Sequence, residues 1–152
     1  MLLFTIISAL LIWIDLFTKR LAVTYLAAGQ EIQVIPGFLR FIYVENTGAA
    51  FGILPGARWF LALVALVVSV IIIWYIMTER CRSRVQFFGF VFVFPGAIGN
   101  FINRIMLGYV VDFINLPNWP TFNFADIFIN IGVVLLIIYI LFYSGKEEQA
   151  HL

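Results

Sequence analysis

The stretch GNFINR, residues 99–104, places two asparagine amides and a guanidinium inside a segment that is otherwise strongly apolar. Polar and ionisable groups are costly in hydrocarbon, so they usually mark a functional site. Asn100, Asn103 and Arg104 are spaced i, i+3 and i+4, so in a helix they share one face. This face is the first candidate wall of a site.

Two other apolar segments carry polar residues at helical spacing. Asn123, Asp126 and Asn130 are spaced i, i+3 and i+7. Asp15 and Lys19 form an acid–base pair at i and i+4. If the segments pack as a bundle, the three polar faces lie at one depth and converge at its non-cytoplasmic end.

Each polar face also has a purely structural explanation. The pair on the first segment could be an interfacial ion pair. Asn123 could cap a helix, with Asp126 in its first turn complementing the helix dipole. The polar residues of 99–104 could bond neighbouring helices or reach lipid headgroups, and Asp112 could be only a loop acid. Convergence of all the faces favours a site.

Carboxylate chemistry is the chemistry that these residue types allow. Cys81 and His151 are the chain's single cysteine and histidine, which rules out a paired-cysteine or histidine metal set. A Cys–His pairing is not expected, because His151 is terminal and Cys81 falls at the opposite membrane surface. Two carboxyls that share one proton can activate water and protonate a leaving amine. Asp126 suits one half of such a pair, and we expect Asn103 to face it from the neighbouring helix.

The composition is that of a membrane protein. Of the 152 residues, 64% are hydrophobic and 11% are charged, whereas soluble domains are nearer half apolar. A net charge of +1 gives no indication of a nucleic-acid partner. We expect one membrane domain over residues 1–152, with the first helix retained and not cleaved as a signal peptide. Spans of roughly 20 residues are predicted at about 2–22, 57–77, 86–107 and 123–143.

The segment of about 24–56 has a different character from the spans. It contains β-rich runs on either side of a Pro36–Gly37 turn signal. Its backbone polar groups must be paired or hydrated, so we expect a small sheet at the membrane surface. The predicted fold is therefore an all-α bundle of four transmembrane helices with an extracytoplasmic β-sheet insertion between helices 1 and 2.

Basic residues favour an orientation with both termini in the cytoplasm. Arg80, Arg82 and Arg84 cluster in a short loop after the second span, and Lys146 follows the fourth. Five other basic residues fall on the opposite side, so the raw count alone is equivocal.

Five motifs in order along the chain resemble those of the bacterial prolipoprotein signal peptidase, signal peptidase II. The resemblance implies an intramembrane aspartyl endopeptidase without metal or cofactor. It would remove signal peptides from diacylglyceryl-cysteine prolipoproteins near the outer face of the inner membrane, where cyclic peptide antibiotics inhibit the family. The motifs are DLFTK (15–19), VENTGAAFG (44–52), PGAIGNFINRI (95–105), GYVVDFI (108–114) and FNFAD (122–126).

Carried over by residue, the resemblance implies two catalytic positions, Asp126 and Asn103, the second standing where the family has an aspartate. The sheet would cradle the substrate, and a short interfacial helix near Pro117–Pro120 would gate the cleft. Supporting or binding roles fall on Asp15, Lys19, Asn46, Asn100, Arg104, Asp112 and Asn123.

Asn103 and Pro95 depart from the family pattern. An amide cannot exchange the proton of a dyad, and a general acid–base group is worth about 10²–10⁴-fold in rate. We therefore expect the chain to be inactive or nearly so, whether Asn103 is engineered or natural. The alternatives are a non-catalytic membrane protein that binds lipidated prolipoproteins and, with little support, a small transporter.

Overall fold

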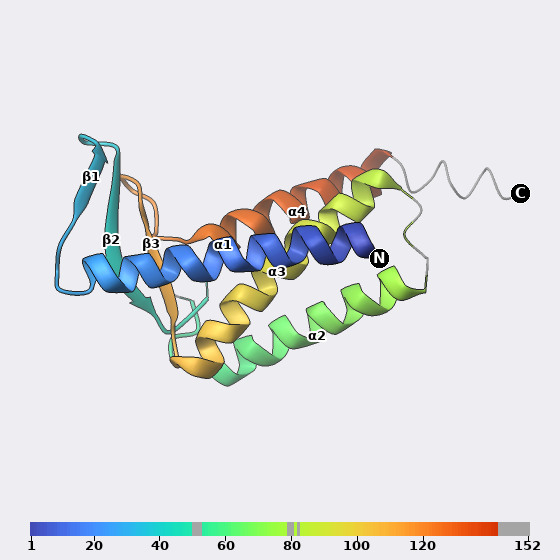
Figure 1. The fold of residues 1–152 in the computed structure, drawn as a ribbon, viewed down its shortest axis with the longest axis horizontal. Coiled ribbons are helices and arrows are strands. Elements are labelled where there is room, and N and C mark those ends of the chain that lie inside the picture. Colours follow the sequence, from blue (N-terminus) through green and yellow to red (C-terminus); the bar gives the residue numbers. More distant parts are fainter. Residues whose placement is uncertain (50–52, 79–80, 82, 143–152) are drawn as a thin grey trace, which may run out of the picture.

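The computed structural model describes residues 1–49, 53–78, 81 and 83–142. Within this part of the chain, four helices are long and apolar enough to cross a membrane, as predicted (Figure 1). The first helix runs four residues beyond its expected end. Three of the four basic residues used for the orientation, at positions 80, 82 and 146, lie outside the described part. The helices are α1 (Leu2–Leu26), α2 (Arg58–Met77), α3 (Arg84–Met106) and α4 (Phe124–Phe142).

Helix α3 is the central helix and packs against the other three. Ser83 caps its start by accepting the Val85 N–H at 3.2 Å. Small residues let α4 approach closely: a Cβ at Gly96 would lie 2.5 Å from the Ala125 carbonyl oxygen. The helix continues through Pro95, which is buried. This close contact sets α3 and α4 side by side.

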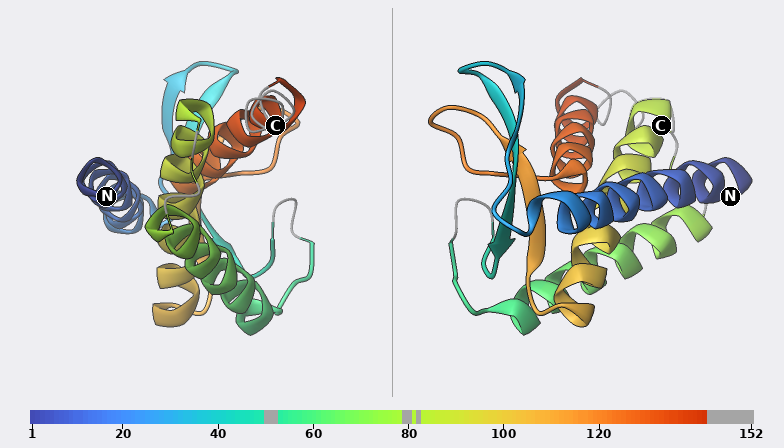
Figure 2. Two further views of the ribbon diagram at one scale, coloured as in Figure 1. Left: turned by 90° about the vertical axis from the view of Figure 1, so that its right-hand side faces the viewer. Right: turned by 60° about the vertical axis from the view of Figure 1, so that its left-hand side comes forward.

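A three-stranded antiparallel sheet closes one end of the bundle (Figure 2). The predicted segment supplies β1 (Ile32–Ile35) and β2 (Leu39–Asn46), and Gly37 in the turn between them has a φ of 73°. The third strand, β3 (Val110–Asn115), comes from the stretch after α3 and was not predicted. Its pairing with β2 places Asp112 opposite Val44. Segments far apart in the sequence therefore meet at this end of the helices.

The prediction of an interfacial helix near Pro117–Pro120 is wrong. The residues after β3 form a turn instead, with Asn118 at a φ of 57°. Neither proline carries a backbone N–H, and a left-handed residue between them interrupts any helix. Trp119 is exposed here, which suits the headgroup level of a membrane.

Candidate active site

Polar side chains from α1, α3, α4, β2 and β3 meet where the sheet joins the bundle, which confirms the predicted convergence. Hydrogen bonds and one ion pair link all of them except Asn103 into one network. Asn46, Arg104 and Asp126 are partly buried. The other members each expose 6% or less of their surface, and they are Asp15, Lys19, Asn100, Asn103, Asp112 and Asn123.

The pair on α1 is buried and spans three helices. Lys19 Nζ lies 2.8 Å from Asp15 Oδ2, and both side chains are almost fully enclosed. Asp15 Oδ1 accepts the Ala125 N–H at the start of α4, at 2.9 Å. Gly99 of α3 has no side chain because a Cβ there would collide with the Asp15 carboxylate. The ion pair of Asp15 and Lys19 is therefore internal, and the interfacial location that the sequence also allowed is wrong.

Asn123 and Asp126 form a reciprocal cap at the start of α4. Asn123 Oδ1 accepts the Asp126 N–H at 3.0 Å, and Asp126 Oδ2 accepts the Asn123 N–H at 3.2 Å. This confirms the predicted cap and fixes the Asp126 carboxylate in the first turn. Asn130 does not join the cluster, because it is exposed and donates to the Asp126 carbonyl oxygen.

The second carboxyl of the cluster is Asp112 on β3. Its Oδ1 accepts the Asn123 side-chain amide at 2.6 Å, and its Oδ2 accepts the Asn46 side-chain amide at 2.9 Å. Asn123 thus holds both acids, Asp112 through its side chain and Asp126 through its backbone N–H. The geometry brings two carboxyls from different elements to one small residue.

Burial raises the pKa of Asp112 from its ordinary 3.8 to about 6, and the nearby charge of Asp126 adds to this effect. The hydrogen bonds from Asn46 and Asn123 and the charge of Lys19 oppose it. An acid with this pKa is partly protonated near neutrality. Such a group can donate a proton, while a second, ionised carboxyl beside it can accept one.

Arg104 connects the two carboxyls to the loop after β2. Its guanidinium lies within the electrostatic field of both Asp126 and Asp112. It donates to the Gly48 carbonyl oxygen at 3.0 Å, so it does not extend to the headgroups. The Gly48 N–H in turn donates to Asn46 Oδ1 at 2.9 Å, which directs the Asn46 amide towards Asp112. Positions 50–52 of the same motif lie outside the described residues.

Asn103 is engaged with β3. Its Oδ1 accepts the Val111 N–H at 3.1 Å in a buried contact. The α3 side chain that bonds Asp126 is Asn100, whose Nδ2 donates to Asp126 Oδ1 at 2.9 Å. The sequence interpretation assigned Asp112 only a supporting role, although one signal was available. Of the chain's three aspartates, Asp15 has Lys19 as a partner at i+4, which leaves Asp112 as the candidate to join Asp126.

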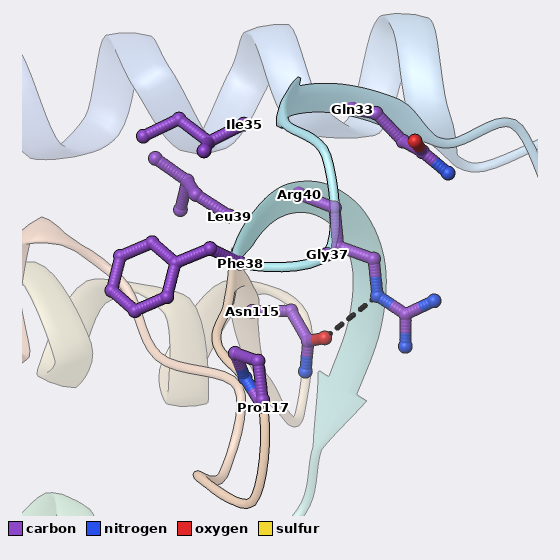
Figure 3. A pocket seen from close by; sticks show the side chains of 8 residues that line it. All are labelled: Gln33, Ile35, Gly37, Phe38, Leu39, Arg40, Asn115 and Pro117. Atoms are coloured by element: carbon purple, nitrogen blue, oxygen red, sulfur yellow. Dashed lines mark hydrogen bonds between the residues drawn. The ribbon is translucent and has the colours of Figure 1, made fainter.

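A hollow of about 260 Å³ lies on the same sheet, beyond the end of β3 (Figure 3). Arg40 lines one side of it from β2, and its side chain donates to Asn115 Oδ1 at 2.8 Å. Its remaining lining is largely apolar, from the β1–β2 hairpin and the turn after β3: Gln33, Ile35, Gly37, Phe38, Leu39 and Pro117. Among the described residues, no group of three or more His, Cys, Asp or Glu side chains is placed to hold a metal ion.

Comparison with known proteins gives a consistent family. The model of signal peptidase (SPase) II matches residues 7–142. The lipoprotein signal peptidase of Enterococcus faecalis is 39% identical over 146 residues, covering 95% of this chain and 91% of that protein. That of Clostridium novyi is 42% identical over 133 residues, covering 84% and 90%. A solved bacterial membrane enzyme superposes with a TM-score of 0.85 at 32% identity, covering 91% of this chain and 87% of that one.

Proposed function

This chain belongs to the signal peptidase II family, and from that premise we propose that it is an aspartyl endopeptidase whose catalytic pair is Asp112 and Asp126. Its substrates are prolipoproteins, from which it removes the signal peptide. One observation carries the choice of residues: Asn123 hydrogen-bonds both carboxyls at once. Asp112 thereby takes the place that the sequence interpretation gave to Asn103.

The pair cleaves the peptide bond by moving protons between water, substrate and carboxyls. The ionised aspartate takes a proton from a water molecule as its oxygen attacks the scissile carbonyl. The protonated aspartate donates its proton to the carbonyl oxygen. When the tetrahedral intermediate collapses, the C–N bond breaks and the leaving amine takes a proton from the pair. The raised pKa of Asp112 supports this division of one proton between two acids.

Under this proposal Asn103 leaves the pair intact. Its amide oxygen secures β3 through the Val111 N–H, next to Asp112 in the chain. Asparagine performs this task as well as aspartate, because only an acceptor oxygen is needed. We therefore infer that the chain is active as it stands, in place of the inactivity expected from the sequence.

The substrate meets the pair at the sheet end of a multi-pass bacterial membrane protein. We infer that this end is the outer one, with both termini cytoplasmic. The N-terminus and Arg84 at the start of α3 lie together at the end of the bundle away from the sheet (Figure 1), and basic residues favour the cytoplasmic side. The apolar hollow beside Arg40 supports binding of a lipid-modified substrate such as a diacylglyceryl-cysteine peptide. Membrane lipid would border this hollow, and cyclic peptide antibiotics would inhibit cleavage by occupying it.

The test is cleavage of a lipidated signal-peptide substrate by the purified chain in a membrane mimic. We expect turnover by the unaltered chain, and a loss of about 10³-fold or more in Asp112→Asn and in Asp126→Asn. Glu45→Gln is the matched control, because Glu45 is an exposed acid that bonds Tyr43 and not the cluster. Turnover that survives either aspartate change would refute the pair. Saturable binding without product in the unaltered chain would favour the non-catalytic alternative.

A further inference from the structure

Lys19 is a buried cation that the proposed chemistry does not use directly. Its Nζ donates to Asn100 Oδ1 at 2.9 Å and is ion-paired with Asp15. An ammonium has donors and no acceptor, so Asn100 must present its carbonyl oxygen to Lys19. The Asn123 amide also donates to Asn100 Oδ1, at 3.3 Å. Two donors therefore fix which way the Asn100 amide points.

With its oxygen held by Lys19, Asn100 can only turn its NH₂ group towards Asp126. That contact is 2.9 Å long and ends on Asp126 Oδ1. The ammonium polarises the amide and strengthens its N–H as a donor, since hydrogen bonds in a chain reinforce one another. The other oxygen of Asp126 accepts the Asn123 N–H at the start of α4, where the helix dipole favours negative charge.

Asp112 lacks both of these features. Its two hydrogen-bond donors are the side-chain amides of Asn46 and Asn123. It lies on a strand, no backbone N–H group at the start of a helix is among its two donors, and it exposes only 2% of its surface. Burial raises its pKa to about 6. Of the two acids, Asp112 is therefore the one whose protonated form is favoured.

The charges around the pair also require one proton. Asp126 is faced by Asp15 and Lys19 from α1, by Arg104 from α3 and by Asp112 from β3. With both members of the pair ionised, three carboxylates would face two cations in a largely buried site. One proton on the pair makes the cluster neutral, which a site of low dielectric favours.

We propose that Lys19 is a positioning residue that acts through Asn100 to keep Asp126 as the ionised base and to leave the shared proton on Asp112. This assignment rests on the proposed aspartyl chemistry and gives each acid one role. Asp126 takes the proton from water, and Asp112 gives its proton to the carbonyl oxygen. The hydrogen bonds of Asn100 and Asn123 hold the two roles apart.

The test compares Asp15→Asn with the double variant Asp15→Asn/Lys19→Met. Both retain an oxygen at position 15 for the Ala125 N–H. They differ only at Lys19, and neither leaves a buried carboxylate without its cation. We expect the acidic limb of the kcat/KM profile to move up by about one pH unit when Lys19 is also replaced, because a donor that favours ionised Asp126 is weakened. KM should stay the same.

An unchanged or downward-shifted acidic limb, in a variant that still cleaves, overturns the positioning role. If the double variant does not fold, infrared spectra of the unaltered protein at pH 5 decide the matter. The band of a protonated carboxyl should disappear in Asp112→Asn and persist in Asp126→Asn. A band that survives Asp112→Asn, or no band in the unaltered protein, overturns the assignment. The proposed function fails separately, through cleavage that survives loss of either aspartate.

Discussion

Asp112→Asn should stop cleavage and at the same time stabilise the folded protein at neutral pH. The pKa of Asp112 rises from 3.8 to about 6 on folding, because burial and the charge of Asp126 disfavour its ionised form. A difference of about two pH units corresponds to about 3 kcal/mol. The fold therefore loses about that much stability when Asp112 is ionised, and asparagine cannot ionise.

The gain is reduced by one lost hydrogen bond. Both oxygens of Asp112 accept amide N–H groups, from Asn123 at 2.6 Å and from Asn46 at 2.9 Å. The NH₂ group of an asparagine at this position would meet one of these donors, at a cost of about 1 kcal/mol. We expect a net stabilisation of about 2 kcal/mol at pH 8.

The sign of the effect should change with pH. A group whose pKa is raised on folding contributes its stability below its unfolded pKa, and this contribution is lost as pH rises through the folded pKa. For Asp112 the window runs from 3.8 to about 6. The advantage of the variant therefore shrinks on acidification, and the two stability curves should cross near about pH 4.5, where the lost hydrogen bond begins to dominate.

The measurement is reversible denaturation with SDS in mixed micelles, for both proteins, between pH 4 and pH 8. Glu45→Gln is the control for removing an acid, because Glu45 is exposed, and its curve should run parallel to that of the unaltered chain. Parallel curves for Asp112→Asn, or lower stability at pH 8, would refute the reasoning. Either result would mean that folding does not disfavour ionised Asp112.

Two other substitutions test the neighbouring positions. Asn103→Asp should change the cleavage rate less than tenfold, because aspartate still offers an oxygen to the Val111 N–H; a rise from no activity to full activity, measured in the same peptide assay, would instead support a catalytic role at 103. Gly99→Ala should destabilise the fold by about 1–3 kcal/mol in the SDS titration, because its methyl group would collide with the Asp15 carboxylate. A neutral result there would contradict the close packing of α3 on α1.

Much of the fold could be predicted from sequence because the relevant physics is local. A helix satisfies its own backbone hydrogen bonds, so length and apolar composition are enough to locate a membrane span. The spacing of Asp15 and Lys19 sets their ion pair within one helix turn. The Asn123–Asp126 cap is likewise a contact over three residues.

The proposed pairing of Asp112 with Asp126 rests on tertiary structure. β3 becomes a strand because β2 offers it backbone partners, and the Asn46–Asp112 hydrogen bond joins residues 66 positions apart. Nothing in the spacing along one helix could reveal that contact. The sequence determined that acids and amides would gather at one end of the bundle. Only the packing of β3 against β2 and α3 brings Asp112 to Asn123, which also bonds Asp126, and sets Asn103 against the Val111 N–H. The physical reason is that strand pairing depends on partners that lie far away in the chain.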